Sequence, residues 1–281
     1  MPNTEVDFRA GAPVRGDLDV RWIHGDATDP PIQVHTHDPH TFILRQNKAV
    51  HYEAPFLYLF RGNDRALLLD TGATPEPDLF PLRATIDTLL ADSRPGYELV
   101  VAHTHAHGDH IAGDPQFADR PLTTVVAPDL AAVQKFFDLT DWPTGITTFD
   151  LGGRVLEITG IPGHHETSIA VYDPWTGFLL TGDTVYPGRL YVRDFPAFVA
   201  SLEHLVTFAA DRPVTHVMGC HIEMTNQPGR DYPIGTTYQP DEPPLPMTVA
   251  QLRAVRDAAI TVADHPGIHV FNDFIIYNGA S

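Results

Sequence analysis

The amino-acid sequence predicts an α/β protein made of two β-rich halves of similar plan. Each half reads as a β-hairpin, an aspartate at the end of its second strand, a helix, and another strand that leads into a histidine. The spacing agrees as well, because 35 residues separate Asp70 from His105 and 38 residues separate Asp183 from His221. A repeated plan is harder to obtain by chance than a single motif. The strand ends of both halves are therefore the places where we expect function.

The first half begins with two apolar runs, residues 56–60 and 66–69, which are joined by a polar turn and predict a hairpin. Asp70 follows the second of these strands. Apolar residues at helical spacing then predict a helix over residues 79–90, before a proline and a glycine. Residues 99–102 predict a short strand that runs directly into a cluster of histidines.

The second half repeats these elements in the same order. Residues 169–172 and 178–180 predict a hairpin, and Asp183 follows it. Residues 195–209 have the apolar periodicity of a helix, and residues 214–218 predict the strand that precedes His221. Between the halves we expect strands at 123–127 and 154–159 with a helix at 128–137.

The two ends of the chain lie outside this repeat. Residues 1–40 are rich in proline, glycine and aspartate and predict an irregular arm with one short strand at 19–23. Residues 228–246 predict a proline-rich loop, followed by a helix at 249–263 with Thr248 as its cap and a closing strand at 270–277. We expect residues 1–281 to form one domain.

Composition excludes several classes of protein. Hydrophobic residues make up 43% of the chain, which is enough to form a packed core. The formal net charge of −18 disfavours nucleic acid and anionic membrane surfaces as partners. Residues 1–10 carry no basic and apolar secretory pattern, and no run approaches the roughly 18 apolar residues of a membrane span. We therefore expect a soluble, cytoplasmic protein.

Residue usage also restricts the kind of metal site. Cys220 is the only cysteine, so an internal disulfide and a site with several thiolates are both excluded. The chain contains 16 histidines, and histidine is the commonest metal ligand. His105, His107, Asp109 and His110 form an HxHxDH pattern directly after a buried strand. In such a turn, alternate side chains can converge on one ion and the following pair on a second, and divalent zinc suits these nitrogen and oxygen ligands.

At these residues the chain resembles the metallo-β-lactamase superfamily, and the match runs from Asp70 to His221 without a large insertion. The resemblance implies a four-layer αββα sandwich. It implies that His105, His107 and His164 hold one metal ion, that Asp109, His110 and His221 hold the other, and that Asp183 bridges the two. Asp70 matches an acid that stabilises the metal loop in the family. Two Zn²⁺ ions are the expected cofactors, with iron or manganese as alternatives.

The expected chemistry follows from two cations in one site. They would lower the pKa of a shared water, direct the resulting hydroxide at a carbonyl and stabilise the oxyanion that develops. Asp109 is expected to act both as a ligand and as the group that orients the hydroxide or manages its proton. Tyr186 lies three residues after Asp183, as a tyrosine does in related acyl-homoserine lactonases, and is a candidate hydrogen-bond donor to the carbonyl oxygen.

Other polar residues are weaker candidates. Thr104 is expected to support the ligands together with Asp70, and His103 is expected to lie behind the ligands or in the core. His165, Glu166 and Thr167 depart from the usual family residues after His164. His35, His37 and His40 have ligand-like spacing but lie in the predicted arm, so a third metal site there is disfavoured. His51 and Tyr52 are candidates for substrate contact, and Cys220 is expected to be a core thiol that points away from the metals.

Hydrolysis of an ester-, lactone- or thioester-like carbonyl in a small molecule is the function that we expect. The alternative is a mononuclear iron oxidoreductase of the persulfide dioxygenase type, which uses nearly the same residues. A metal-binding protein without catalytic activity is a third reading, and a homodimer is compatible with the sequence. The pocket walls are expected to come from the arm, the segment around His51 and Tyr52, residues 186–193 and the proline-rich loop, and their sequences do not identify the substrate.

Overall fold

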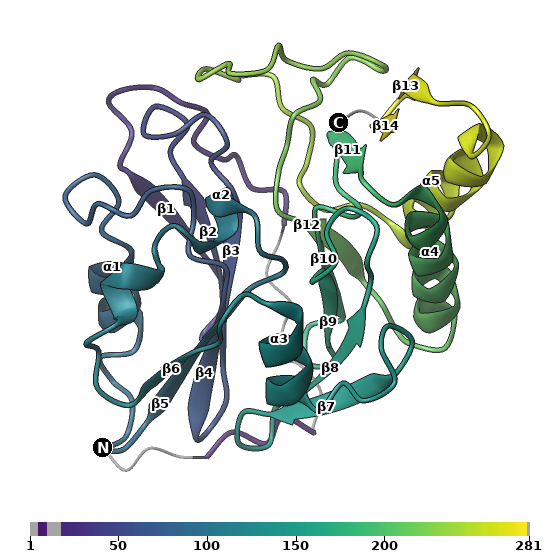
Figure 1. Cartoon of the computed structure of the whole chain (residues 1–281). Helices are drawn as coiled ribbons and strands as arrows, with labels where there is room; N and C mark the ends of the chain where they lie inside the picture. The colour runs from purple at the N-terminus through teal and green to yellow at the C-terminus, as the bar shows by residue number, and fades with distance from the viewer. Residues whose placement is uncertain (1–4, 10–17, 280–281) are drawn as a thin grey trace.

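The computed structural model describes residues 5–9 and 18–279, and these form two large β-sheets, a small third sheet and the helices that cover them (Figure 1). The first sheet has the strand order β1-β2-β3-β4-β5-β6, with β1 (Ile32–Asp38), β2 (Thr41–Gln46), β3 (Phe56–Arg61), β4 (Arg65–Leu69), β5 (Glu98–Ala102) and β6 (Thr123–Val125). The second has the order β12-β10-β9-β8-β7, with β7 (Ile146–Asp150), β8 (Val155–Gly160), β9 (Ile169–Asp173), β10 (Phe178–Gly182) and β12 (His216–Gly219). The third has the order β11-β14-β13, with β11 (Arg189–Val192), β13 (Gly267–Val270) and β14 (Ile275–Asn278).

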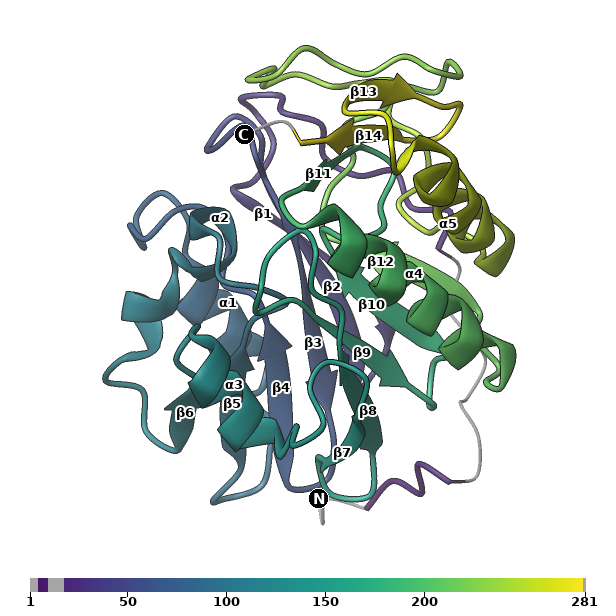
Figure 2. The same ribbon diagram turned by 45° about the vertical axis from the view of Figure 1, so that its right-hand side comes forward.

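Helices lie on both outer faces of the pair of large sheets (Figures 1 and 2), whereas the helix over Leu130–Phe137 packs against the core between the sheets. The helices are α1 (Leu82–Leu89), α2 (Gly108–Ile111), α3 (Leu130–Phe137), α4 (Phe195–Ala210) and α5 (Val249–Val262), with a 3₁₀ turn, η1 (Asp114–Phe117). The long α4 and α5 lie side by side against the second sheet, and α1 lies against the first. None of the helices in the described part of the chain is long and apolar enough to span a bilayer.

Three apolar clusters fill the spaces between these layers, one between the sheets and one under each helical layer. The alternation of side chains along a strand explains how one strand serves two clusters. In β3, Tyr58 and Phe60 join the core between the sheets, whereas Leu57 and Leu59 pack toward α1. This arrangement is the predicted αββα sandwich.

The repeated plan predicted for the two halves is confirmed by the strand pairing. β3 and β4 form an antiparallel hairpin, and β5 pairs parallel to β4 after the intervening α1. In the same way β9 and β10 form an antiparallel hairpin, and β12 pairs parallel to β10 after the intervening α4. Because parallel neighbours end at the same edge of a sheet, each half places the loops after its two parallel strands side by side.

The prediction of an irregular N-terminal arm was wrong over residues 32–40. Residues 32–38 form β1, which pairs antiparallel with β2, a strand that the sequence analysis also missed. Alternating Ile32, Val34 and Thr36 provide the β-branched face that makes this segment a strand, and the density of prolines and polar residues around it hid the pattern. Residues 19–23 form no strand, and residues 1–4 and 10–17 of the arm lie outside the described residues.

The C-terminal strand predicted at 270–277 was also wrong, because this segment is a hairpin. β13 and β14 pair antiparallel, and the turn between them contains Asn272 and Asp273, residues that favour turns. β14 also pairs parallel to β11, which the sequence analysis did not predict. β7 was missed as well, whereas α5 begins as expected, with a reciprocal pair of hydrogen bonds between Thr248 and Gln251.

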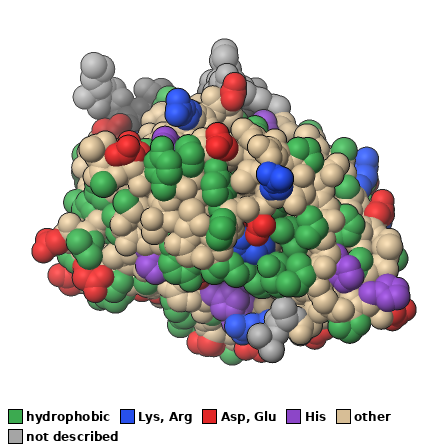
Figure 3. Space-filling model, turned by 90° about the horizontal axis from the view of Figure 1, so that it is seen from above, with side chains coloured by type: hydrophobic (Ala, Val, Ile, Leu, Met, Phe, Trp, Pro, Cys, Tyr) green, Lys and Arg blue, Asp and Glu red, His purple; other side chains and the backbone are tan. Residues whose placement is uncertain are grey.

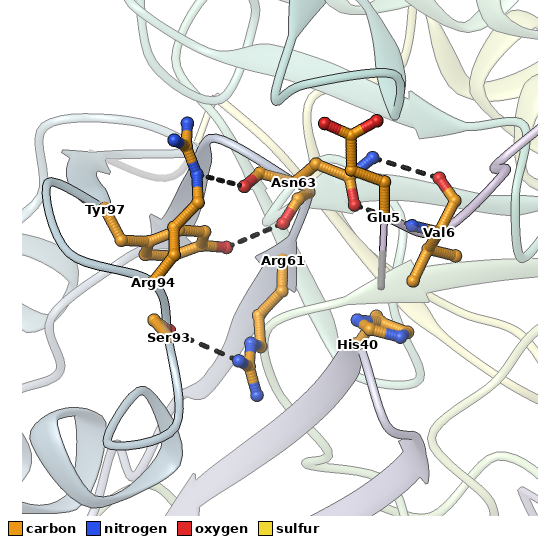
Figure 4. Close-up of a pocket in the computed structure, with 9 residues that line it drawn as sticks. Glu5, Val6, His40, Arg61, Asn63, Ser93, Arg94 and Tyr97 are labelled. Atoms are coloured by element: carbon orange, nitrogen blue, oxygen red, sulfur yellow. Dashed lines mark hydrogen bonds between the residues drawn. The ribbon is translucent and has the colours of Figure 1, made fainter. Parts of the chain in front are cut away.

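At the opposite end of β4 from Asp70, a small cavity of about 130 Å³ lies beside the turn that joins β3 to β4 (Figure 4). The side chain of Asn63 accepts a hydrogen bond from the Val6 amide at 2.8 Å and donates one to the Val6 carbonyl at 3.0 Å. Arg94 Nε donates to the Asn63 carbonyl at 3.0 Å. These bonds fasten the segment around Val6 to the first sheet.

A buried arginine links the two large sheets. Arg154, which is 1% exposed, donates both from Nε and from a terminal nitrogen to the carboxylate of Asp173, at 3.2 and 2.6 Å. Its remaining donors reach the first sheet, where they bind the carbonyls of His40 and Arg61 and the hydroxyl of Thr41 at 2.7 to 3.2 Å. All five guanidinium donors are therefore satisfied.

We expect Arg154→Ala to lower the free energy of unfolding by about 3–5 kcal/mol, because it leaves the Asp173 carboxylate buried without its cation. Urea denaturation followed by circular dichroism measures this loss. Arg253 on the exposed face of α5 provides a matched control, and Arg253→Ala should change stability by less than about 0.5 kcal/mol. A loss below 1 kcal/mol for the Arg154 variant would contradict this role.

Candidate metal centre

The HxHxDH residues lie where β5 ends and α2 begins. His103 to His107 form the connection, and Asp109 and His110 lie in the single turn of α2. His164 comes from the turn after β8, Asp183 from the end of β10, and His221 from the end of β12. The facing sheets bring these loops together, so that residues 116 positions apart in the sequence meet at one end of the sandwich.

Three imidazole nitrogens meet in the first ligand group. His105 Nε2 lies 2.9 Å from His107 Nδ1 and 3.2 Å from His164 Nε2, and the latter two atoms are 2.9 Å apart. For comparison, nitrogens about 2.05 Å from a tetrahedral zinc are about 3.3 Å from one another. Three mutually close nitrogens cannot all be satisfied by hydrogen bonds among themselves, and their spacing fits one shared cation.

The second ligand group contains two histidines and two carboxylates. His110 Nε2 and His221 Nε2 each lie 3.3 Å from an oxygen of Asp109. They lie 3.5 and 3.4 Å from Asp183 Oδ2. All four groups place one ligand atom within 4.8 Å of the others, as do the three histidines of the first group.

Asp183 stands between the two groups. Its Oδ2 atom lies 4.0 Å from His105 Nε2 and 3.8 Å from His164 Nε2, in addition to its contacts in the second group. The other oxygen of Asp183 is buried and has no hydrogen-bond partner in the described part of the chain. A carboxylate placed in this way fits two neighbouring cations, and an unsatisfied buried oxygen has a physical reason to bind one.

In three of the candidate ligand rings, the Nδ1 atom, which faces away from the centre, forms a hydrogen bond with another residue. His164 Nδ1 lies 2.7 Å from the Tyr191 carbonyl, His221 Nδ1 lies 3.0 Å from the Glu53 carbonyl, and His110 Nδ1 lies 2.9 Å from an oxygen of Asp70. Because a carbonyl or carboxylate only accepts, each Nδ1 carries the proton and donates it. With Nδ1 as the donor, Nε2 is the nitrogen left to face the centre, which is the usual arrangement of metal-binding histidines.

Asp70 anchors the turn that carries the ligands. One of its oxygens accepts from the Thr104 amide at 2.7 Å, and the other accepts from the Thr104 hydroxyl at 2.9 Å. The second oxygen also accepts from the thiol of Cys220 at 3.3 Å. Burial raises the pKa of that thiol, which stays protonated and able to donate. Cys220 is thus a core residue, as expected, but it also contacts the group that supports the ligands.

The histidine pKa values shift in opposite directions in the two ligand groups. Burial lowers the pKa of His105 and of His164, and it lowers the pKa of His107 to about 4. These three rings are neutral at pH 7 and ready to act as ligands. Burial also opposes the charge of His110 and His221, but nearby carboxylates outweigh it and raise the pKa of both rings. A divalent cation would take the place of the protons in that second group.

A cavity of about 310 Å³ opens onto both ligand groups. Its walls include Glu53, Tyr186, Tyr191, Arg193 and Glu223. Residues 186–193 were expected to line the pocket, and so was the segment around His51 and Tyr52, which Glu53 follows directly. Glu223 was missed, and its position two residues after His221 was the available signal. This end of the sandwich faces the viewer in Figure 3, where acidic, basic and histidine side chains are dispersed among hydrophobic and uncharged ones.

Tyr186 lines this cavity, but its hydroxyl is engaged. It donates to the Arg189 carbonyl and lies 3.2 Å from the carboxylate of Glu223. Burial raises the pKa of Tyr186 well above its ordinary value. Its ring packs edge-on against His221, with the centroids 5.7 Å apart. In this arrangement Tyr186 orients a ligand ring, and donation of its proton to a substrate would first require the Arg189 bond to break.

The weaker candidates lie around the centre or away from it. His103 contacts the His110 carbonyl and Asp114, each at 3.2 Å, and so lies behind the ligands. The His165 ring packs 4.8 Å from that of His107, and its Nδ1 accepts from Thr167. Tyr52 is 39% exposed and stacks on His51.

His35 and His37 belong to β1, and His40 follows it. The rings of His35 and His37 lie 6.5 Å apart, and His37 packs on Phe178 with the ring centroids 4.8 Å apart. The described residues that could share a metal ion include none of these three histidines.

We expect Asp70→Asn to weaken metal binding about 10- to 100-fold, because an amide cannot accept from Thr104, His110 and Cys220 as the carboxylate does. Competition with a chelator, monitored by metal content, measures this effect. Asp129→Asn, at the cap of α3, is the control and should leave the affinity unchanged. Equal affinity in the two variants would remove Asp70 from the support of the ligands.

The chain is similar in sequence to a known family and to individual proteins. The family model described as the metallo-beta-lactamase superfamily matches residues 54–231. A hydroxyacylglutathione hydrolase from Rhizobium meliloti is 27% identical over 165 residues, covering 56% of this chain and 63% of that protein. The acyl-coenzyme A thioesterase MBLAC2 of Bos taurus is 26% identical over 167 residues, covering 48% and 59%. The chain thus matches less than two thirds of the length of each of these relatives.

The fold also agrees with a solved structure. A metallo-β-lactamase from Erythrobacter litoralis superposes with a TM-score of 0.58 at 17% identity, over 83% of this chain and 98% of that one. At this identity the likeness concerns the fold alone. The family match covers the hairpin that leads to Asp70, every candidate ligand and the first ten residues after His221. This chain belongs to the metallo-beta-lactamase superfamily.

Proposed function

We propose that this protein is a hydrolase that uses two divalent metal ions to cleave an ester-, lactone- or thioester-like carbonyl compound. The observation that carries the proposal is the position of Asp183, whose Oδ2 atom lies within 4.0 Å of nitrogens from both ligand groups. His105, His107 and His164 would hold one ion, and Asp109, His110 and His221 the other. Zinc is the expected metal because imidazole and carboxylate ligands suit it, with iron or manganese as alternatives.

Bound ions of this kind supply an activated water and positive charge beside the oxygen on which negative charge develops. The protein supplies the rest of the chemistry. Asp109, at the floor of the cavity, is placed to orient the attacking water and to take up its proton. The neutral rings of His105, His107 and His164 would contribute ligands without adding charge.

The names of the relatives favour one type of bond within this class. One is a hydroxyacylglutathione hydrolase and the other an acyl-coenzyme A thioesterase. Thioesters are therefore the first substrates to test, and esters and lactones come next. Tyr186 remains a candidate for contact with the carbonyl oxygen, although its hydroxyl is bonded to Arg189 in this structure.

We expect His107→Ala and Asp183→Ala to remove bound metal and hydrolytic activity together while the protein stays folded. Each variant deletes a ligand, and Asp183→Ala deletes the group shared by both ions. Metal quantification and a panel of thioesters, aryl esters and lactones measure the two losses, and circular dichroism checks the fold. The exposed His265 provides the control, and His265→Ala should keep both metal and activity.

Metal analysis of the unaltered protein separates the competing functions. Two equivalents of zinc with hydrolysis of a panel member support the proposal. One equivalent of iron with oxygen uptake would instead identify an oxidoreductase of the persulfide dioxygenase type. Bound metal without turnover of any acyl substrate would indicate a protein that only binds metal.

A further inference from the structure

An arginine stands beside the first ligand group at the wall of the metal cavity. Arg193 follows β11 and lines the cavity together with His107 and His164. Its amide donates to the carbonyl of Gly163 at 2.9 Å, which fixes the backbone of Arg193 against the turn that carries His164. The side chain is exposed, so its charged end is available at the opening of the cavity.

The guanidinium of Arg193 has no partner in the described part of the chain. Most arginines of this acidic protein form ion pairs. Arg193 does not, and the carboxylate of the next residue, Asp194, binds another group. Asp194 Oδ1 accepts from the Ala197 amide at 3.0 Å and caps α4. The formal net charge of the protein is −18 and repels anions, whereas the unpaired positive charge of Arg193 attracts them beside the cavity.

Charges on the cavity wall are divided between its two ends. Glu53 and Glu223 lie near His221, where the Glu53 carbonyl accepts from that ring and the Glu223 carboxylate pairs with Arg189 at 2.7 Å. Arg193 lies at the other end. It is the only arginine or lysine among the described residues that line the cavity. The positive charge of Arg193 is thus unpaired, whereas the positive charge near His221, that of Arg189, is paired with Glu223.

We propose that Arg193 determines substrate specificity by binding a carboxylate or phosphate group of the substrate at the His107 end of the cavity. This inference rests on the proposed hydrolase function and assigns the substrate to the anionic acyl compounds. Arginine is suited to the role because its planar donors match both kinds of anion.

The test compares Arg193→Glu with Arg253→Glu, which makes the same change of charge on the exposed face of α5. Two matched pairs of thioesters distinguish the anions. The first pair is the S-phenyl thioester of succinic acid with a free carboxylate and with that carboxylate methylated. The second is S-acetyl-2-mercaptoethyl phosphate and S-acetyl-2-mercaptoethanol. Metal content is measured for every variant, so that a loss of ions is not mistaken for a change of specificity.

We expect Arg193→Glu to lower the ratio of kcat/KM for the anionic member to that for the neutral member by about 10-fold or more in at least one pair, mainly through KM. Arg253→Glu should leave both ratios unchanged. The pair that responds identifies the carboxylate or the phosphate as the recognised group. Unchanged ratios in both pairs for Arg193→Glu would overturn the inference.

A binding measurement separates this inference from the proposed function. Succinate and inorganic phosphate are titrated calorimetrically into the metal-loaded protein, which requires no turnover. Weaker binding of one of them by Arg193→Glu, but not by Arg253→Glu, supports the anion site even where none of the four thioesters is hydrolysed. Equal binding by the two variants counts against the site, whatever the enzyme hydrolyses.

Discussion

The metal centre depends on one buried carboxylate, that of Asp70. It joins the end of β4 to the turn after β5 through Thr104, to the second ligand group through His110, and to the end of β12 through Cys220. Asp70 adopts a φ of 70°, a conformation that costs a residue with a side chain of order 1–3 kcal/mol. Its hydrogen bonds to three segments offset that cost and fix the turn from which four of the seven candidate ligands project.

The seven candidate ligands come from both halves of the repeat, so no half contains a complete site. The first half supplies His105, His107, Asp109 and His110, and the later part of the chain supplies the others. Packing of the two sheets is therefore a precondition for the centre, and the buried contacts of Arg154 across the sheets contribute to that packing. Metal binding in turn should favour the packed state, because the unfolded chain offers no preformed site.

The sequence predicts the parts of the fold and site that are encoded locally. The HxHxDH spacing, the aspartates at two strand ends and the apolar runs of the two hairpins are such signals, and the structure brings these residues together. It could not predict β1, because its β-branched face is interrupted by polar residues and surrounded by prolines. Nor could it predict that Tyr186 is engaged by Arg189 and Glu223, since that bond depends on the packing of β11 against the loop after β12.

The single cysteine has a consequence that extends beyond the metal site. Cys220 has no exposed surface and lies where the two halves meet, with its thiol directed at Asp70. A thiol-specific reagent can modify it only after this junction separates. Because the sequence contains no other cysteine, the rate of labelling reports the separation of the two halves alone. A slower rate with added zinc would measure how strongly the ions stabilise the packed state of the halves.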